Sequence, residues 1–190
     1  MDDQALLRQA IRIEAAAQQA LLRGDAAHAR TLFRTAAERY RASWEAAPPD
    51  AYGRLVGLLK ASILWGEGGH DAAYVRRALG DGPCASPASC YALAIAALVQ
   101  GDDEAALGAI AGMRAGDAAF LRTADAMAAL VHGDRDAYAE AVNAIVADFA
   151  TRESYLTGVP FADTAVMLER LAAPRGMAAW PESSLMPVLR

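Results

Sequence analysis

Apolar residues recur along this chain at intervals of three and four, the spacing that places them on one face of an α-helix. No stretch alternates apolar and polar residues in the manner of a β-strand. The fold is therefore expected to be all-α. The pattern predicts about nine helices, over residues 3–23, 25–47, 50–65, 71–79, 87–100, 102–114, 117–132, 134–155 and 161–172.

A Gly-Asp pair follows an apolar helical run at three places, residues 24–25, 101–102 and 133–134. Glycine ends helices because it enters the left-handed conformation without a Cβ clash. The aspartate that follows can cap the next helix by accepting hydrogen bonds from its free N–H groups. Each pair therefore predicts that one helix stops and another starts at once, which gives stacked antiparallel helical hairpins.

The spacing of the helix-ending glycines suggests a repeat. Gly24, Gly66, Gly101 and Gly133 are 42, 35 and 32 residues apart, and tetratricopeptide repeats recur at about 34 residues. By their small residues and Gly-Asp turns, segments 86–116 and 117–149 resemble two degenerate tetratricopeptide hairpins. The resemblance implies a right-handed stack of hairpins, an α-solenoid whose concave face holds a peptide or a partner helix.

The domain organisation is simple. A chain of 190 residues is large enough for one proper hydrophobic core. Residues 1–173 are expected to form a single helical-hairpin domain. Residues 174–190 contain three prolines and no helical period, so they are interpreted as a tail that lies along the body or is loose.

Charge and hydropathy limit the classes of partner that this protein can bind. The net charge is −5 and no run of basic residues occurs, whereas nucleic acid requires a concentrated basic face. The acidic start is unlike a signal peptide, and the longest apolar stretch, residues 91–99, is far shorter than the roughly 20 residues that cross a bilayer. We expect a cytoplasmic protein with neither a nucleic acid nor a membrane as partner.

The expected redox state of the two cysteines, Cys84 and Cys90, follows from that localisation. A cytoplasmic pair is normally reduced, so a disulfide between them is the less favoured alternative. Cys90 is expected to pack as a small apolar residue in a buried helix. Cys84, in a loop, is the thiol to test for reactivity.

The chain carries no recognisable catalytic or cofactor motif. The three histidines, His28, His70 and His132, lack the spacing that pairs two metal ligands on a helix face. No nucleophile elbow or phosphate-binding loop is present, and the glycine-rich segment 66–70 is interpreted as a turn between helices. We therefore expect neither a metal nor a cofactor. A non-enzymatic role is favoured, and enzymatic activity stays open as the alternative.

Three groups of residues are candidates for binding. Large aromatic side chains anchor many interfaces, and Tyr52 and Trp65 are such candidates, while Tyr40 and Trp44 match the apolar period and are assigned to the core. Arginine side chains can bind carboxylates through two parallel hydrogen bonds, so a group of arginines forms the second candidate. The alternative interpretation is that these arginines only form the solvent-exposed face of a helix. The arginines in question are Arg76 and Arg77, together with Arg30, Arg34, Arg39 and Arg41.

The third group lies in residues 155–164, a segment that contains the break between the last two predicted helices. The amides near Thr157 and Gly158 are candidates for binding an anion or a peptide carboxylate. Asp163 falls in the first turn of the last helix, where its charge suits the helix dipole. Capping is the favoured interpretation of this segment, and ligand binding the alternative.

The sequence favours a non-enzymatic protein–protein interaction module. One alternative is a neutraliser of a toxic enzyme, because segments 168–172, 175–177 and 185–187 resemble bacterial polymorphic-toxin immunity proteins. A second is a small-molecule binder or enzyme with a pocket between hairpins. Residues proposed to line that pocket are Tyr91, Met127, Tyr138 and Asp163. A homodimer through the first two helices is a further expectation.

Overall fold

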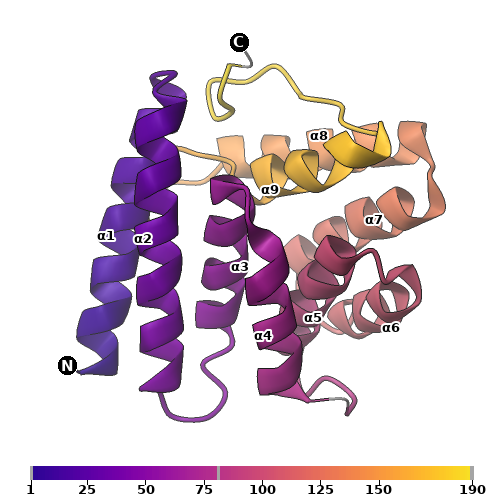
Figure 1. Ribbon diagram of the computed structural model, residues 1–190. Coiled ribbons are helices and arrows are strands. Elements are labelled where there is room, and N and C mark those ends of the chain that lie inside the picture. The colour runs from indigo at the N-terminus through magenta and orange to yellow at the C-terminus, as the bar shows by residue number, and fades with distance from the viewer. Residues whose placement is uncertain (1, 81, 189–190) are drawn as a thin grey trace.

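The computed structural model describes residues 2–80 and 82–188, which form nine α-helices and no β-strand (Figure 1). The prediction of an all-α fold is confirmed. The helices are α1 Asp3–Leu22, α2 Ala26–Glu45, α3 Gly53–Trp65, α4 Gly68–Leu79, α5 Pro87–Gln100, α6 Asp103–Met113, α7 Ala118–His132, α8 Arg135–Ala150 and α9 Asp163–Ala172, followed by the short 3-10 helix η1 Ala173–Arg175.

The Gly-Asp pairs separate helices as predicted. Asp25, Asp102 and Asp134 each accept a hydrogen bond, 3.1 Å long, from the backbone N–H three residues further on. A left-handed φ, of 81°, 71° and 70°, is found at the preceding Gly24, Gly101 and Gly133. Each pair therefore ends one helix and caps the next, which explains how the chain reverses within so few residues.

Several helix boundaries differ from the prediction by a few residues, among them the end of α8 and the start of α4. α8 ends at Ala150 rather than near residue 155, and a loop follows it. α4 begins at Gly68, so the prediction that segment 66–70 is wholly a turn is wrong. Only Gly66, with φ of 105°, breaks the helix. A Cβ at Gly68 would lie 3.3 Å from the side chains of Ile63 and Val99, so this glycine allows close packing of α4.

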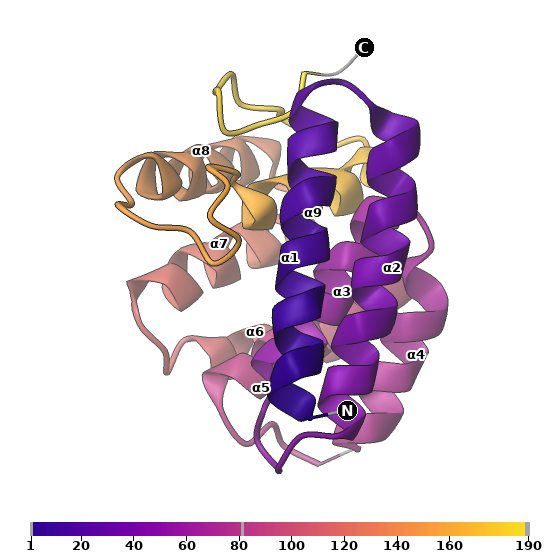
Figure 2. The ribbon, with the colours of Figure 1, turned by 90° about the vertical axis from the view of Figure 1, so that its left-hand side faces the viewer.

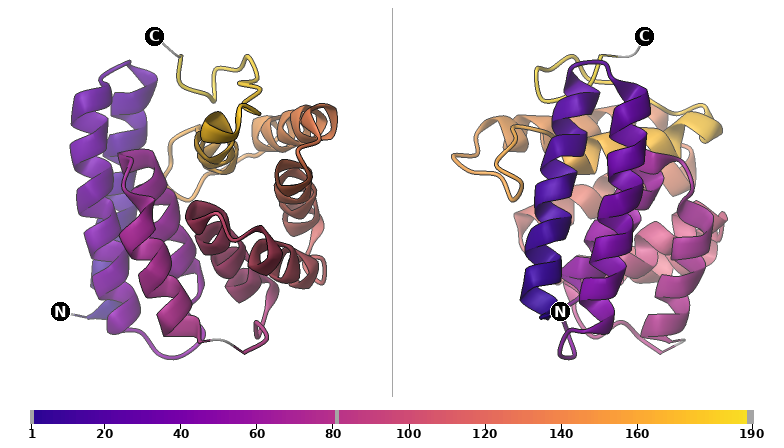
Figure 3. Two further views of the ribbon diagram at one scale, coloured as in Figure 1. Left: turned by 45° about the vertical axis from the view of Figure 1, so that its right-hand side comes forward. Right: turned by 60° about the vertical axis from the view of Figure 1, so that its left-hand side comes forward.

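Consecutive helices pack as antiparallel pairs, with α1 against α2, α2 against α3, α4 against α5, α5 against α6 and α7 against α8. In Figure 1 helices α1 to α4 stand side by side, and α8 and α9 run across them. The last helix returns to the first half of the chain, where α9 contacts α3. Figure 2 shows α9 behind α1, and Figure 3 shows it between the first helices and α8, with the C-terminal segment beside it.

Small residues bring the first three helices close together. Ala10, Ala17 and Ala36 are fully buried where α1 faces α2, and alanine permits a short distance between helix axes. Gly57 on α3 lies directly under the ring of Tyr40, because a Cβ there would stand 2.7 Å from two ring carbons. The aromatic ring of Tyr40 therefore fixes the spacing of α2 and α3.

The C-terminal segment lies along the body of the protein as far as residue 188. Met177, Leu185 and Met186 are buried, and the N–H of Ala162 donates to the carbonyl of Leu185 at 3.0 Å. The tail therefore contributes to the core beside α9. None of the described helices is long and apolar enough to span a membrane.

The structure contradicts the expectation that the cysteines are free thiols. Cys84 and Cys90 form a disulfide, because the loop before α5 turns back and brings their Cα atoms to 5.1 Å. Cys84 is therefore not available as a reactive thiol in this state. A Cβ at Gly112 would lie 2.4 Å from the Cys90 sulfur and 2.8 Å from that of Cys84, so α6 packs directly on the bridge.

Candidate functional site

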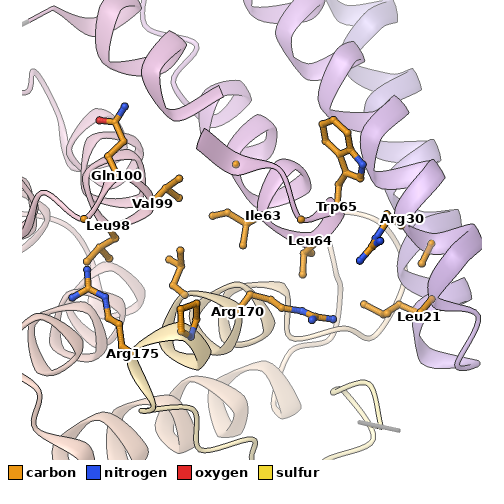
Figure 4. Close-up of a pocket in the computed structure, with 17 residues that line it drawn as sticks. Leu21, Arg30, Ile63, Leu64, Trp65, Leu98, Val99, Gln100, Arg170 and Arg175 are labelled. Atoms are coloured by element: carbon orange, nitrogen blue, oxygen red, sulfur yellow. The ribbon is translucent and has the colours of Figure 1, made fainter. Parts of the chain in front are cut away.

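A groove lies between the α1/α2 turn, the C-terminal ends of α3 and α5, and the end of α9 (Figure 4). Its volume is about 560 Å³, within the range of ligand-binding pockets, about 300–1,000 Å³. The apolar residues that line it are Leu21, Ala26, Ala29, Ile63, Leu64, Leu98, Val99, Leu171 and Pro174. We call this concavity the arginine-rimmed groove.

Three arginines supply the charge of the groove. Figure 4 shows Arg30 and Arg170 at the end beside Leu64, and Arg175 at the other end beside Leu98. No aspartate or glutamate is among the described residues that line it. A protein with a net charge of −5 therefore presents one locally positive concave surface.

The three arginines differ in their partners. Arg175 holds Asp103 with two hydrogen bonds, from Nη2 at 2.7 Å and from Nη1 at 3.1 Å. Neither Arg30 nor Arg170 forms an ion pair with a described residue, and both are exposed. The Arg170 guanidinium lies 5.9 Å from the ring centroid of Trp180 in the tail. Two guanidinium groups are thus free to bind a carboxylate or phosphate.

Two further side chains shape the edge of the groove. Trp65 is half-buried and lines it at the end of α3. Gln100 lines the opposite side, and its Oε1 accepts a hydrogen bond from Arg76 Nη1 at 2.8 Å. Of the residues predicted for binding, Trp65 and Arg30 line the groove. Arg76 does not line it, but it donates a hydrogen bond to the lining residue Gln100.

A second unusual feature is a set of polar side chains at the start of α9, most of them buried and two half-buried, which we call the buried polar cluster. Its members are Glu14, Gln18, Tyr40, Lys60, Thr157, Asp163 and Thr164. They come from α1, α2, α3, α9 and the loop before α9, so the cluster joins both ends of the chain. Apolar packing surrounds it on α1, α2 and α3.

Lys60 and Asp163 form the ion pair of the cluster. Lys60 Nζ donates to Asp163 Oδ2 at 2.9 Å and to Thr164 Oγ1 at 2.8 Å. Burial lowers the pKa of Lys60, but the charge and hydrogen bond of Asp163, together with the charges of Tyr91 and Glu14, outweigh burial, and the pKa lies above its ordinary value. The lysine is therefore a fixed cation and not a nucleophile.

Glu14 is the titratable group of the cluster. It is 3% exposed and accepts hydrogen bonds from the hydroxyl of Tyr40 at 2.5 Å and from Gln18 Nε2 at 3.2 Å. Burial, followed by the negative charge of Asp163, raises the pKa of Glu14 to about 7. Its carboxyl group is thus close to half-protonated at neutral pH.

The loop before α9 is tied to the cluster by Thr157. Its hydroxyl donates to Gln18 Oε1 at 2.6 Å, and the N–H of Gly158 donates to the carbonyl of Tyr155 at 2.9 Å. Asp163 Oδ1 also accepts from the N–H of Thr164 at 2.7 Å. The structure therefore engages Thr157, Gly158 and Asp163 in internal contacts.

The other predicted residues are dispersed. Tyr52 lies beside Trp44, with ring centroids 6.0 Å apart, and donates to Asp50 at 2.6 Å. Arg76 pairs with Asp102 at 2.9 Å, and the neighbouring Arg77 is exposed. None of these three predicted residues lines the groove.

Of the residues proposed for a pocket between hairpins, Tyr91 and Asp163 both lie near Lys60, whereas Tyr138 contacts Glu169. Tyr91 lines a smaller cavity of about 280 Å³ with Phe120 and Thr164. Its hydroxyl is buried and has no hydrogen-bond partner among the described residues. Burial raises the pKa of Tyr91, and the positive charge of Lys60, which lies 5.7 Å from the ring centroid, lowers it. Tyr138 is instead fully buried and donates to Glu169 at 3.1 Å.

Glu169 fastens the tail to α9. This carboxylate has no exposed surface, and its Oε2 accepts from the N–H groups of Ala179 and Trp180, each at 2.8 Å. Burial raises its pKa in spite of these hydrogen bonds. Glu169 precedes Arg170, so one turn of α9 holds the tail and also contributes to the groove.

Sequence reasoning missed Arg170 and Arg175 as groove residues because no local motif marks them. A signal for the buried cluster was present. Glu14 and Gln18 fall within the apolar stripe of the first helix, four residues apart and next to Ala17. Polar residues inside a buried stripe require internal partners.

Among the described residues no group of three or more His, Cys, Asp or Glu side chains is arranged to hold a metal ion. A comparison with protein-family models, curated proteins and solved structures finds no match to this chain.

Proposed function

We propose that this protein is a non-enzymatic recognition module that binds a peptide or helix of a protein partner in the arginine-rimmed groove. The proposal treats the antiparallel helix pairs as degenerate tetratricopeptide-like hairpins, an architecture suited to holding partners. It is supported above all by one observation, an apolar groove rimmed by two arginines that have no ion-pair partner within the described chain.

The groove is preferred to the inner face of the helical stack as the binding surface. α9 contacts α3, and Val166, Met167 and Leu168 of α9 have no exposed surface. By contrast, Arg30, Gln100 and Arg170 on the groove rim are exposed. Such a rim is open to a macromolecular partner, which can place side chains on the apolar floor.

Site-specific photo-crosslinking tests the proposal. Trp65 is replaced by p-benzoylphenylalanine, which keeps an aromatic group at the groove, and Glu140, exposed on α8, carries the same replacement as the matched control. We expect one protein of the native lysate to be crosslinked at position 65 in stoichiometric amount and not at position 140. Absence of a position-dependent protein adduct would contradict the proposed function.

A further inference from the structure

We infer that the segment recognised by the groove is an acidic amphipathic helix, with apolar side chains on the groove floor and carboxylates at the Arg30/Arg170 end. This inference rests on the proposed function and specifies the chemistry of the partner. It starts from the charge of the molecule. Seven of the arginines and Lys60 are paired with aspartates. Several exposed arginines of the described chain, Arg39 among them, have no ion pair, but of these only Arg30 and Arg170 line the groove.

The internal pair at the other end shows how the groove handles a carboxylate. Arg175 and Asp103 meet through two parallel N–H···O contacts, the fork geometry in which guanidinium and carboxylate match best. That end of the groove is thus already neutralised by a residue of the chain. The uncompensated positive charge is at the end where Arg30 and Arg170 lie together (Figure 4), so the carboxylates of a partner are expected there.

The floor determines the rest of the ligand. Leu21, Ile63, Leu64 and Leu171 present apolar side chains from three separated segments, and such a surface accepts the apolar positions i, i+3, i+4 and i+7 of a docked helix. The described residues contain no β-strand whose edge an extended peptide could join. Helix-in-groove binding is therefore the mode that these elements allow.

Specificity follows from the same arrangement. A basic helix would place its cations next to Arg30 and Arg170, and like charges in contact repel each other. A neutral helix would cover the floor but leave the two guanidinium groups without an anionic partner. The geometry therefore selects for acidic flanks, and the apolar floor alone does not.

Three stapled model helices test the inference with the full-length protein. All carry Leu on one face; the flanking positions hold Glu in the first, Gln in the second and Lys in the third. We expect the Glu helix to bind about tenfold more tightly than the Gln helix at low ionic strength, and the Lys helix to bind most weakly. The preference should shrink at about 0.5 M salt as screening increases.

Variants assign the preference to the groove. The double substitution Arg30→Gln and Arg170→Gln is expected to abolish the difference between the Glu and Gln helices. Arg39→Gln, an exposed arginine of α2 outside the groove, is the matched control and should preserve it. Circular dichroism on each variant verifies that the helices remain formed.

The outcomes separate the two proposals. Equal binding of the Glu and Gln helices, an unchanged preference in the double variant, or no binding of any helix would overturn the acidic-helix inference. The recognition module itself is judged by the crosslink at position 65. A crosslinked partner whose attached segment is not acidic would overturn the inference and leave the proposed function standing.

Discussion

The arginine-rimmed groove and the buried polar cluster both use residues of α3 and α9, but they differ in how their charges are paired. The cluster uses Lys60 of α3 and Asp163 at the start of α9, which form an ion pair. The groove uses Ile63 to Trp65 of α3 and Arg170 at the end of α9, where the arginine lacks an ion-pair partner among the described residues. The cluster therefore pairs its charges internally, whereas the groove carries two arginines at its rim that have no ion pair with a described residue.

The largest loss of stability is expected when the buried cation of the cluster is removed. Lys60→Met leaves Asp163 without its partner and removes the positive charge that faces Glu14, so we expect a loss of about 3–4 kcal/mol in the free energy of unfolding. Urea denaturation at neutral pH measures it. The control is Arg114→Met, which breaks an exposed pair with Asp125 and should cost less than about 1 kcal/mol. Equal losses would show that the cluster is not a structural unit.

The second prediction concerns pH. Because the folded pKa of Glu14, about 7, exceeds the unfolded value, the native state binds more protons in this range and stability falls as pH rises from about 4.5 to 7. We expect a fall of about 2–3 kcal/mol between pH 5 and pH 8, measured by urea denaturation across that range.

The matched variant is Glu14→Gln, which keeps an acceptor for the Tyr40 hydroxyl but does not titrate. Its stability should fall much less between pH 5 and pH 8, and a remaining slope is assigned to Glu169, whose pKa burial also raises. The same slope in both proteins would assign the effect to another group and remove Glu14 from the account.

A smaller effect is expected at the tail. Glu169→Leu removes the acceptor for two N–H groups and for the hydroxyl of Tyr138, which leaves buried donors unsatisfied and costs about 2 kcal/mol. Hydrogen exchange at Ala179 and Trp180 should accelerate. Glu169→Gln, which retains one oxygen acceptor, is expected to have a milder effect, and unchanged exchange in Glu169→Leu would refute the anchoring role.

The smallest effect on stability is expected in the groove. Because Arg30 and Arg170 have no ion-pair partner to lose, replacing both with Gln should change the free energy of unfolding by no more than about 0.5 kcal/mol. The same double variant is expected to lose its preference for an acidic helix. A large destabilisation would indicate that these arginines serve the fold.

The helices were predictable because their signals are local. Glycines such as Gly101 and caps such as Asp102 act on residues within one turn, and the structure confirms them. The segment 66–70 was misinterpreted because glycine also serves close packing, as Gly68 does against Val99, and that contact depends on a distant helix.

The sites depend on residues far apart in sequence. Asp163 could be recognised as a first-turn residue, but its partner Lys60 lies 103 positions earlier. Arg30 was a candidate among several exposed arginines, and only the fold brings Arg170 to it. The disulfide was disfavoured on grounds of compartment, which say nothing of how closely a loop returns to its helix.

The contact between Tyr40 and Gly57 has a consequence for the chemistry of α1. The ring rests on a position that carries no side chain, while the hydroxyl of the same residue reaches Glu14. A single added methyl group on α3 would push the ring sideways and pull the phenol away from the acid. An uncharged substitution at Gly57, where α2 and α3 cross, would thereby change the pKa of Glu14 on α1.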